Sequence, residues 1–340
     1  MTLHSSHTIY AESFFARNAT LFSPYLAAAG LNQEVLHTPG LEIPLSQYVE
    51  LWEILGREVS PSIGLQVGLR TKCHELGVWG YAVRCAPTMQ LALHCMSHFI
   101  EVLTQGCRIQ VEMAGRSVGI VYQITDPLII QCRQDAEFSV ACGLSIIREI
   151  TECANLSPVR VEFEHGAPAD LSIYNELFEC PVLFNQADNR LYFNEDFLDM
   201  PVRTSEHRLF QALEAFLEQQ RIKRAGSSDL LHGLLRHIAD SLSRGSPSIE
   251  QVAVTMNMGV RTLQRRLADH ALDFSQLVEV VRRSLAENYV SRTDYSLTDI
   301  ALLLGYTEAS SFSRAFRRWM QITPQQYRQQ ARIEALSVGA

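Results

Sequence analysis

The chain has 340 residues, of which 47% are hydrophobic and 19% are charged, and its formal net charge is −8. This length accommodates two domains with a core each, and the composition is that of an ordinary folded protein. The start of the chain lacks a secretory signal, and no apolar stretch approaches the roughly 20 residues that a membrane helix requires. We therefore expect a cytoplasmic protein without a membrane partner.

Charge and cysteines are unevenly distributed. Residues 226–340 hold 13 arginines, 11 acidic residues and no lysine, so the back of the chain is mildly basic and the front is acidic. This asymmetry fits one regulatory and one nucleic-acid-binding domain, although a solvated helical face would give similar counts. All eight cysteines lie between Cys73 and Cys180 without a C-x-x-C pair. That pattern favours small buried hydrophobes over disulfides, with a redox sensor as the alternative.

The first 224 residues mix helical and strand patterns. Helical apolar spacing covers residues 12–30, 46–59, 62–69 and 137–152, and another helix has Pro87 in its first turn. Alternating apolar residues predict a hairpin of 108–113 and 117–124, and further strands at 158–165, 182–185 and 190–194. The mixture predicts an α+β domain over residues 1–224, with a mixed or antiparallel sheet and flanking helices.

The back of the chain is helical throughout. An amphipathic helix over 204–223 ends at a stretch rich in glycine and serine, and we assign residues 225–228 as the linker. Residues 229–340 then form an all-α domain. It contains two related segments, at about 249–269 and 297–319.

Each segment has a short apolar helix, a turn near a glycine, and a second helix with polar and arginine residues outside. Val252-Ala253 matches Ile300-Ala301 at an offset of 48, and Arg265 matches Arg314 at an offset of 49. This is the sequence form of a helix-turn-helix, whose second helix enters the major groove of DNA. A long helix over 274–290, about 25 Å in length, joins the two copies. Two copies suggest a reader of two successive grooves.

The second copy and the residues after it carry a specific signature. It consists of Ile300-Ala301, Leu304-Gly305-Tyr306-Thr307, the run Ser311 to Arg318, Ile322-Thr323-Pro324 and Tyr327-Arg328. With it, residues 249–327 resemble the DNA-binding domain of AraC/XylS-type bacterial transcription regulators. The first copy departs from the family at its turn, where Gly259 sits two places late. Asn257 tolerates the left-handed conformation that such a turn uses.

The front half resembles one effector-domain subtype of the same family, the arabinose-binding-like domain that is not a cupin barrel. The pieces that carry this likeness include Leu76-Gly77, Gly80-Tyr81, Pro87-Thr88, Val161 to His165 and Asn189-Arg190-Leu191. The looser match covers about residues 22–205.

The resemblance implies a transcription regulator, and we expect a small-molecule-responsive activator. Residues 1–224 would bind an unidentified effector and form a homodimer, while residues 229–340 would bind double-stranded promoter DNA and act on RNA polymerase. The alternative is a ligand-independent DNA-binding regulator whose front domain only dimerises. We expect neither an enzyme nor a cofactor, because G-x-S-x-G, H-E-x-x-H, P-loop and G-x-G-x-x-G motifs are all absent.

Arginine and glutamine suit base edges, and spacing of three and four residues places side chains on one helix face. The base-reading candidates are Arg261, Gln264 and Arg265 in the first copy and Ser310, Ser311 and Arg314 in the second. The phosphate-contacting candidates are Arg266, Arg317, Arg318 and Arg328. The alternative for each is a solvated helix face.

Two features of the front half suggest sites without defining them. Trp79, Tyr81 and Arg84 would suit a pocket for an anionic effector, against the alternative of core packing beside a loop. His94 and His98 have zinc-ligand spacing on a helix but no evident third ligand, so we expect a solvated face and no metal site.

Overall fold

The computed structural model describes residues 7–269 and 273–337 and divides into two compact units. The sheet unit comprises His7–Thr125 and Cys132–Ser227. The helical unit comprises Asp126–Gln131 and the described residues from Ser228 onward. The predicted fold class is confirmed, with an α+β front and an all-α back that holds two helix-turn-helix motifs. Within the described ranges, no helix is long and apolar enough to cross a membrane.

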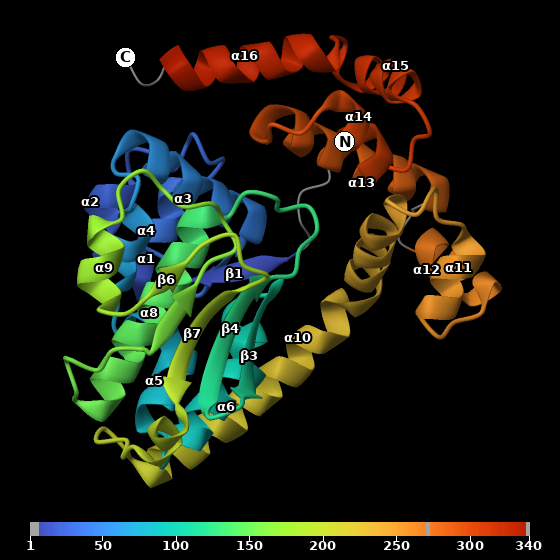
Figure 1. The fold of residues 1–340 in the computed structure, drawn as a ribbon. Helices are drawn as coiled ribbons and strands as arrows, with labels where there is room; N and C mark the ends of the chain where they lie inside the picture. Colours follow the sequence, from blue (N-terminus) through green and yellow to red (C-terminus); the bar gives the residue numbers. More distant parts are fainter. Residues whose placement is uncertain (1–6, 270–272, 338–340) are drawn as a thin grey trace. The chain divides into compact units, whose positions relative to one another are not determined.

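The sheet unit is built around a five-stranded mixed sheet with the order β3-β4-β7-β5-β6 (Figure 1). Its strands are β3 (Cys107–Ala114), β4 (Ser117–Ile124), β5 (Arg160–Glu162), β6 (Val182–Leu183) and β7 (Asn189–Asn194). The β5–β6 pair is parallel and the other pairs are antiparallel. The predicted β3–β4 hairpin is therefore confirmed. A separate pair, β1 (Thr8–Ala11) with β2 (Leu41–Pro44), was not predicted.

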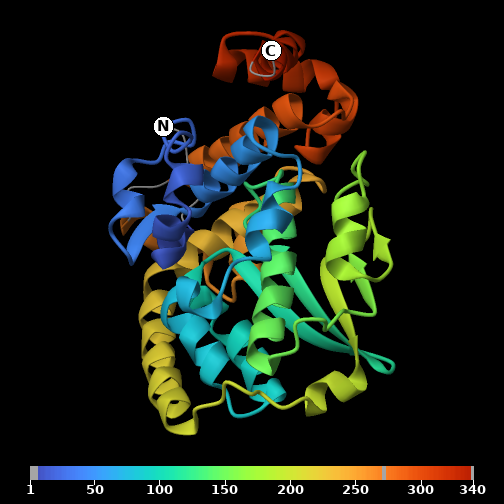
Figure 2. The ribbon, with the colours of Figure 1, turned by 90° about the vertical axis from the view of Figure 1, so that its left-hand side faces the viewer.

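One helix, α8 (Arg133–Thr151), lies across a face of the sheet and is buried along most of its length (Figure 2). Its other side packs on α3 (Leu45–Glu58) and α4 (Ile63–Gly68). The remaining helices of this unit are α1 (Ser13–Arg17), α2 (Ala19–Phe22), α5 (Gly77–Cys85), α6 (Met89–His98), α7 (Ile100–Leu103) and α9 (Ser172–Phe178). Three 3₁₀ turns complete it, at Gln33–Leu36, Cys73–Leu76 and Glu195–Asp199.

The predicted linker, residues 225–228, is helical rather than irregular. Residues 225–228 lie inside α10 (His207–Leu242), and the division between the units falls at Ser227 and Ser228, within this helix. A single glycine costs a helix only about 1 kcal/mol, which the good helix formers on both sides offset. On the sheet-unit part of α10, Arg224 is buried and donates to the carbonyl oxygens of Glu101 (2.9 Å) and Val102 (2.6 Å).

The helical unit has one core, to which all its helices contribute. After α10 the helices are α11 (Ile249–Thr255), α12 (Val260–Asp269), α13 (Phe274–Arg292), α14 (Leu297–Leu303), α15 (Ala309–Met320) and α16 (Pro324–Ser337). The segment Asp126–Gln131 belongs to this unit although it lies between β4 and α8 in the chain. Leu128 is buried in the same core, and the side-chain amide of Asn288 donates to its carbonyl oxygen at 3.2 Å.

Candidate functional sites: two exposed helices and a buried cavity

The first helix-turn-helix consists of α11 and α12. A capping box at Ser248 and Gln251 fixes the start of α11. Leu263 and Leu267 of α12 are fully buried in the core of the helical unit. Because they face inward, the predicted base-reading residues of this helix lie on the exposed side. Those residues are Arg261, Gln264 and Arg265.

The second helix-turn-helix, α14 and α15, repeats this arrangement with larger core residues. Phe312 and Phe316 are fully buried. Ser310 and Arg314 are exposed and Ser311 is half-buried. A guanidinium nitrogen of Arg314 donates to the Ser311 hydroxyl at 3.2 Å. The Ser311–Arg314 pair therefore presents a preformed polar face, and base contact by these residues stays a prediction.

The turns of the two helix-turn-helix motifs have the same backbone conformation. Asn257 has φ 52° and Gly305 has φ 77°, so both are left-handed. In each turn the next amide donates to a carbonyl five residues back, Met258 to Ala253 at 2.9 Å and Tyr306 to Ala301 at 2.8 Å. The prediction for Asn257 is confirmed. Gly259 is two places late because Asn257 stands where Gly305 stands in the second copy.

The two turns should differ in how strongly a substitution changes stability. A Cβ on Gly305 would lie 2.5 Å from the carbonyl oxygen of Leu242, and its φ is also unfavourable for alanine. We expect Gly305→Ala to destabilise the helical unit by about 1–3 kcal/mol. The matched Asn257→Gly should change stability by less than about 1 kcal/mol. Urea denaturation followed by circular dichroism measures both, and equal effects would show that the packing at Gly305 is irrelevant.

The predicted phosphate contacts fall into two groups. Arg266 and Arg317 are exposed, and neither forms an ion pair with another described residue. Arg318 instead pairs with Glu279, and Arg328 donates to the carbonyl oxygens of Val290 (3.0 Å) and Tyr295 (2.8 Å). Arg328 thus holds the end of α13, a role that the sequence did not predict. Phosphate contact stays a prediction for all four.

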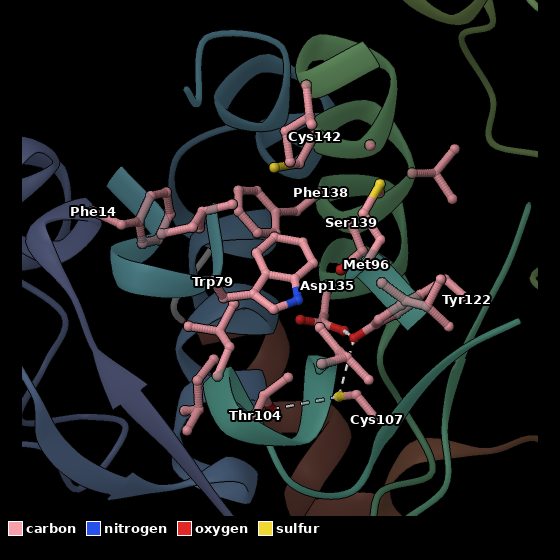
Figure 3. A pocket seen from close by; sticks show the side chains of 18 of the residues that line it. Phe14, Trp79, Met96, Thr104, Cys107, Tyr122, Asp135, Phe138, Ser139 and Cys142 are labelled. Atoms are coloured by element: carbon pink, nitrogen blue, oxygen red, sulfur yellow. Dashed lines mark hydrogen bonds between the residues drawn. The ribbon is translucent and has the colours of Figure 1, made fainter. Parts of the chain in front are cut away.

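The sheet unit encloses an apolar cavity of about 100 Å³ (Figure 3). Residues of β1, α1, α3, α5, α6, α7, β3, β4, α8 and β7 line it, and most of them are aliphatic or aromatic. Of the three predicted pocket residues, Trp79 lines the cavity. Tyr81 and Arg84 do not, which corrects that prediction. Tyr81 points outward from α5 and is 45% exposed, while Arg84 forms an ion pair with Glu149 at 3.4 Å.

Polar groups are few in the cavity and come from distant parts of the chain. Asp135 of α8 is buried and accepts a hydrogen bond from the Tyr122 hydroxyl at 2.6 Å. Tyr122 also lies 3.3 Å from the Cys107 sulfur. Burial raises the pKa of Asp135 to about 7, although the hydrogen bond from Tyr122 stabilises the carboxylate and so lowers the pKa. Nothing in the local sequence marks Asp135, which lies two residues before the predicted helix of 137–152.

The cysteines are not joined in disulfides. Burial raises the pKa of the Cys73 and Cys142 thiols far above the ordinary range. His94 and His98 stack with ring centroids 4.9 Å apart, and His98 lies 3.4 Å from Glu218. Among the residues that the structure describes, no group of three or more potential ligands is placed to hold a metal.

Comparison with known proteins covers both units. The model of the N-terminal arabinose-binding domain of AraC transcription regulators matches residues 22–202, and a helix-turn-helix domain model matches residues 235–330. The transcriptional regulator VirS of Mycobacterium tuberculosis is 28% identical over 309 residues, 90% of each chain. The ornithine utilization regulator of Pseudomonas aeruginosa is 27% identical over 312 residues, 89% of each chain.

Among solved structures, the transcriptional regulator CdpR of Pseudomonas aeruginosa is 25% identical. The match has a TM-score of 0.45 and covers 92% of this chain and 98% of that one. The relatives named here are transcription regulators rather than enzymes. The arabinose-binding model alone spans more than half of the sequence, so the chain belongs to the AraC family of DNA-binding transcription regulators.

Proposed function

We propose that this DNA-binding regulator responds to a small molecule held in the cavity of the sheet unit. The observation that carries the proposal is the cavity itself, whose wall is apolar and holds a few polar groups. Cavities of this composition are typical of small-molecule sites. As the effector of a regulator, the bound molecule is expected to be released unchanged.

The path of the chain supports a coupling between the cavity and the DNA-binding helices. Ile120, Val121 and Tyr122 of β4 line the cavity, and so does Asp135 near the start of α8. Between them the chain passes through Asp126–Gln131, the segment that belongs to the helical unit. A ligand that shifts β4 or α8 therefore acts on residues covalently joined to that segment. It changes DNA binding only if its affinity differs between the two states.

The finer points of the function are proposals as well. We propose that the exposed faces of α12 and α15 read two successive major grooves, with the predicted arginines, glutamine and serines at base edges. Arg266 and Arg317, exposed at the ends of these faces, suit phosphate contacts. We further propose that the protein is a homodimer and an activator that works with RNA polymerase, as its family membership suggests.

A reporter under the control of the regulator's own promoter tests the response. We expect output from the wild type to vary across a panel of carbon and nitrogen sources. Trp79→Ala should flatten that variation, because the indole forms part of the cavity wall. In the wild type, output should differ by about 5- to 150-fold between sources, and Trp79→Ala should lose this difference. Tyr81→Ala is the matched control, since Tyr81 lies on the same helix outside the cavity.

A second variant separates loss of ligand from loss of fold. Ser139→Phe fills the cavity from α8 and should flatten the response, while immunoblots verify unchanged protein levels. Wild-type output that is uniform on every source, and equal to that of Ser139→Phe, would support the ligand-independent alternative.

A further inference from the structure

The cavity contains a hydrogen-bond donor that has no acceptor. Trp79 is only 4% exposed, and its indole nitrogen Nε1 has no hydrogen-bond partner. Leaving such a group unpaired costs about 1–3 kcal/mol in general, so natural proteins rarely do so without a reason. Trp79 lines the cavity, and Figure 3 shows its nitrogen turned into the open space.

An acceptor faces the same space. One carboxylate oxygen of Asp135, Oδ2, accepts from Tyr122, and no hydrogen bond from a described residue reaches the other oxygen, Oδ1. Asp135 is 2% exposed as a whole residue and lines the cavity. In Figure 3 the indole nitrogen is turned toward the Asp135 carboxyl group, and no hydrogen bond joins the two groups.

The charge of the lining selects against an anionic ligand. None of the residues that the described structure places around the cavity is lysine, arginine or histidine, while Glu12 and Asp135 are acidic. A ligand carboxylate or phosphate would therefore be buried without a counter-charge and beside two acids, which is strongly unfavourable. The lining therefore argues against the anionic effector that Arg84 suggested in the sequence.

The size of the cavity sets a second limit. Its volume of about 100 Å³ is of the same order as the engineered apolar cavity of about 150 Å³ that binds benzene. The ligand is therefore about the size of one ring or a short branched chain. Its body must be apolar, because Met96, Ile100, Phe138 and similar side chains form most of the wall.

We propose that the effector is a small, uncharged, mainly apolar molecule with one hydroxyl group, which accepts from Trp79 Nε1 and donates to Asp135 Oδ1. This inference rests on the proposed function, because it names the ligand of the same cavity. A hydroxyl is the smallest group that makes both hydrogen bonds at once. An ammonium group would satisfy Asp135 and leave the indole unpaired, and a hydrocarbon would satisfy neither.

A matched series of probes tests the ligand class on the full-length protein. Benzyl alcohol, toluene, benzylamine and benzoate share one ring and differ in the attached group, and ligand-observed NMR titration measures their affinities. We expect benzyl alcohol to bind about 5- to 150-fold more tightly than toluene, as two hydrogen bonds of ordinary net strength imply. Benzylamine should bind more weakly than benzyl alcohol, and benzoate should bind most weakly of all.

Two variants assign the preference to the named groups. Trp79→Phe keeps an aromatic wall and removes the donor, so benzyl alcohol should lose its advantage over toluene. Asp135→Asn replaces the carboxylate that accepts the ligand's hydroxyl hydrogen with an amide, and it should also reduce the preference for benzyl alcohol over toluene. With two variants, the test stays informative if one of them fails to fold. Tyr81→Phe, outside the cavity, should leave all four affinities unchanged.

The possible failures are distinguishable. Tighter binding of benzylamine or benzoate than of benzyl alcohol overturns the ligand class. Equal binding of toluene and benzyl alcohol, or binding of none of the four probes, overturns it too. None of these results touches the proposed function, which the reporter response of the cavity variants decides separately.

Discussion

Replacing Arg314 or Arg265 with alanine is expected to weaken binding to the operator by about 10- to 100-fold, or about 1–3 kcal/mol each. The two arginines occupy equivalent exposed positions, each at the sixth residue of its recognition helix, α15 or α12. Removing a guanidinium group that makes two hydrogen bonds to guanine also removes discrimination against other bases. Each variant should therefore relax base preference in its own half of the site.

The measurement needs an operator first, which selection from a random duplex library with the wild-type protein supplies. Gel-shift titrations at one fixed salt concentration then compare the variants, because phosphate contacts make affinity depend on salt. Arg208→Ala, an exposed arginine of the sheet unit, is the control. Wild-type affinity and unchanged preference in both Arg265→Ala and Arg314→Ala would contradict the proposed recognition surface.

Asp135→Asn is expected to stabilise the sheet unit at pH 8 by on the order of 4 kcal/mol. In the folded protein the pKa of Asp135 is raised to about 7 by burial, whereas an unfolded aspartate has a pKa of about 3.9. The folded state therefore binds this proton more tightly, so wild-type stability falls as pH rises from about 4 to about 7. Above pH 7 the buried carboxylate imposes its full cost, which the asparagine avoids.

Below about pH 4 the acid is protonated in both states, and the stability difference between Asp135→Asn and the wild type should vanish. Urea denaturation followed by tryptophan fluorescence measures it, since Trp52 and Trp79 are buried in the sheet unit. The matched control variant is Asp196→Asn, at an exposed aspartate of the same unit. A variant less stable than the wild type at pH 8 would show that the Tyr122 hydrogen bond outweighs the desolvation of the carboxylate.

The helix-turn-helix motifs could be predicted from the sequence because their information is local. The apolar spacing and the polar face of each motif lie within a window of about 20 residues, and the repeat at offsets of 48 and 49 shows the same pattern twice. The change of offset from 48 to 49 has a structural cause. One more residue separates the left-handed Gly305 from the start of α15 than separates Asn257 from α12.

The cavity could not be predicted, because its walls come from residues far apart in sequence. Trp79 and Asp135 are 56 positions apart, and each helix alone gives no reason to pair them. Helix α5 was missed as well, since Gly77 and Gly80 suggest a break. A Cβ at Gly80 would lie 1.9 Å from the carbonyl oxygen of Cys73, so this glycine serves close packing instead. Without α5, the outward direction of Tyr81 could not be foreseen.

The segment Asp126–Gln131 also bears on how the protein folds as it is made. Leu128 and Asn288, which meet in the helical unit, are 160 residues apart in the chain. At about 5–20 residues per second, a ribosome needs roughly 8–32 seconds to add the intervening residues. For most of that interval β4 and α8 are already synthesised, while the core of the helical unit that buries Leu128 is still incomplete. The sheet unit must therefore fold around an apolar segment that stays unburied until the last third of the chain emerges.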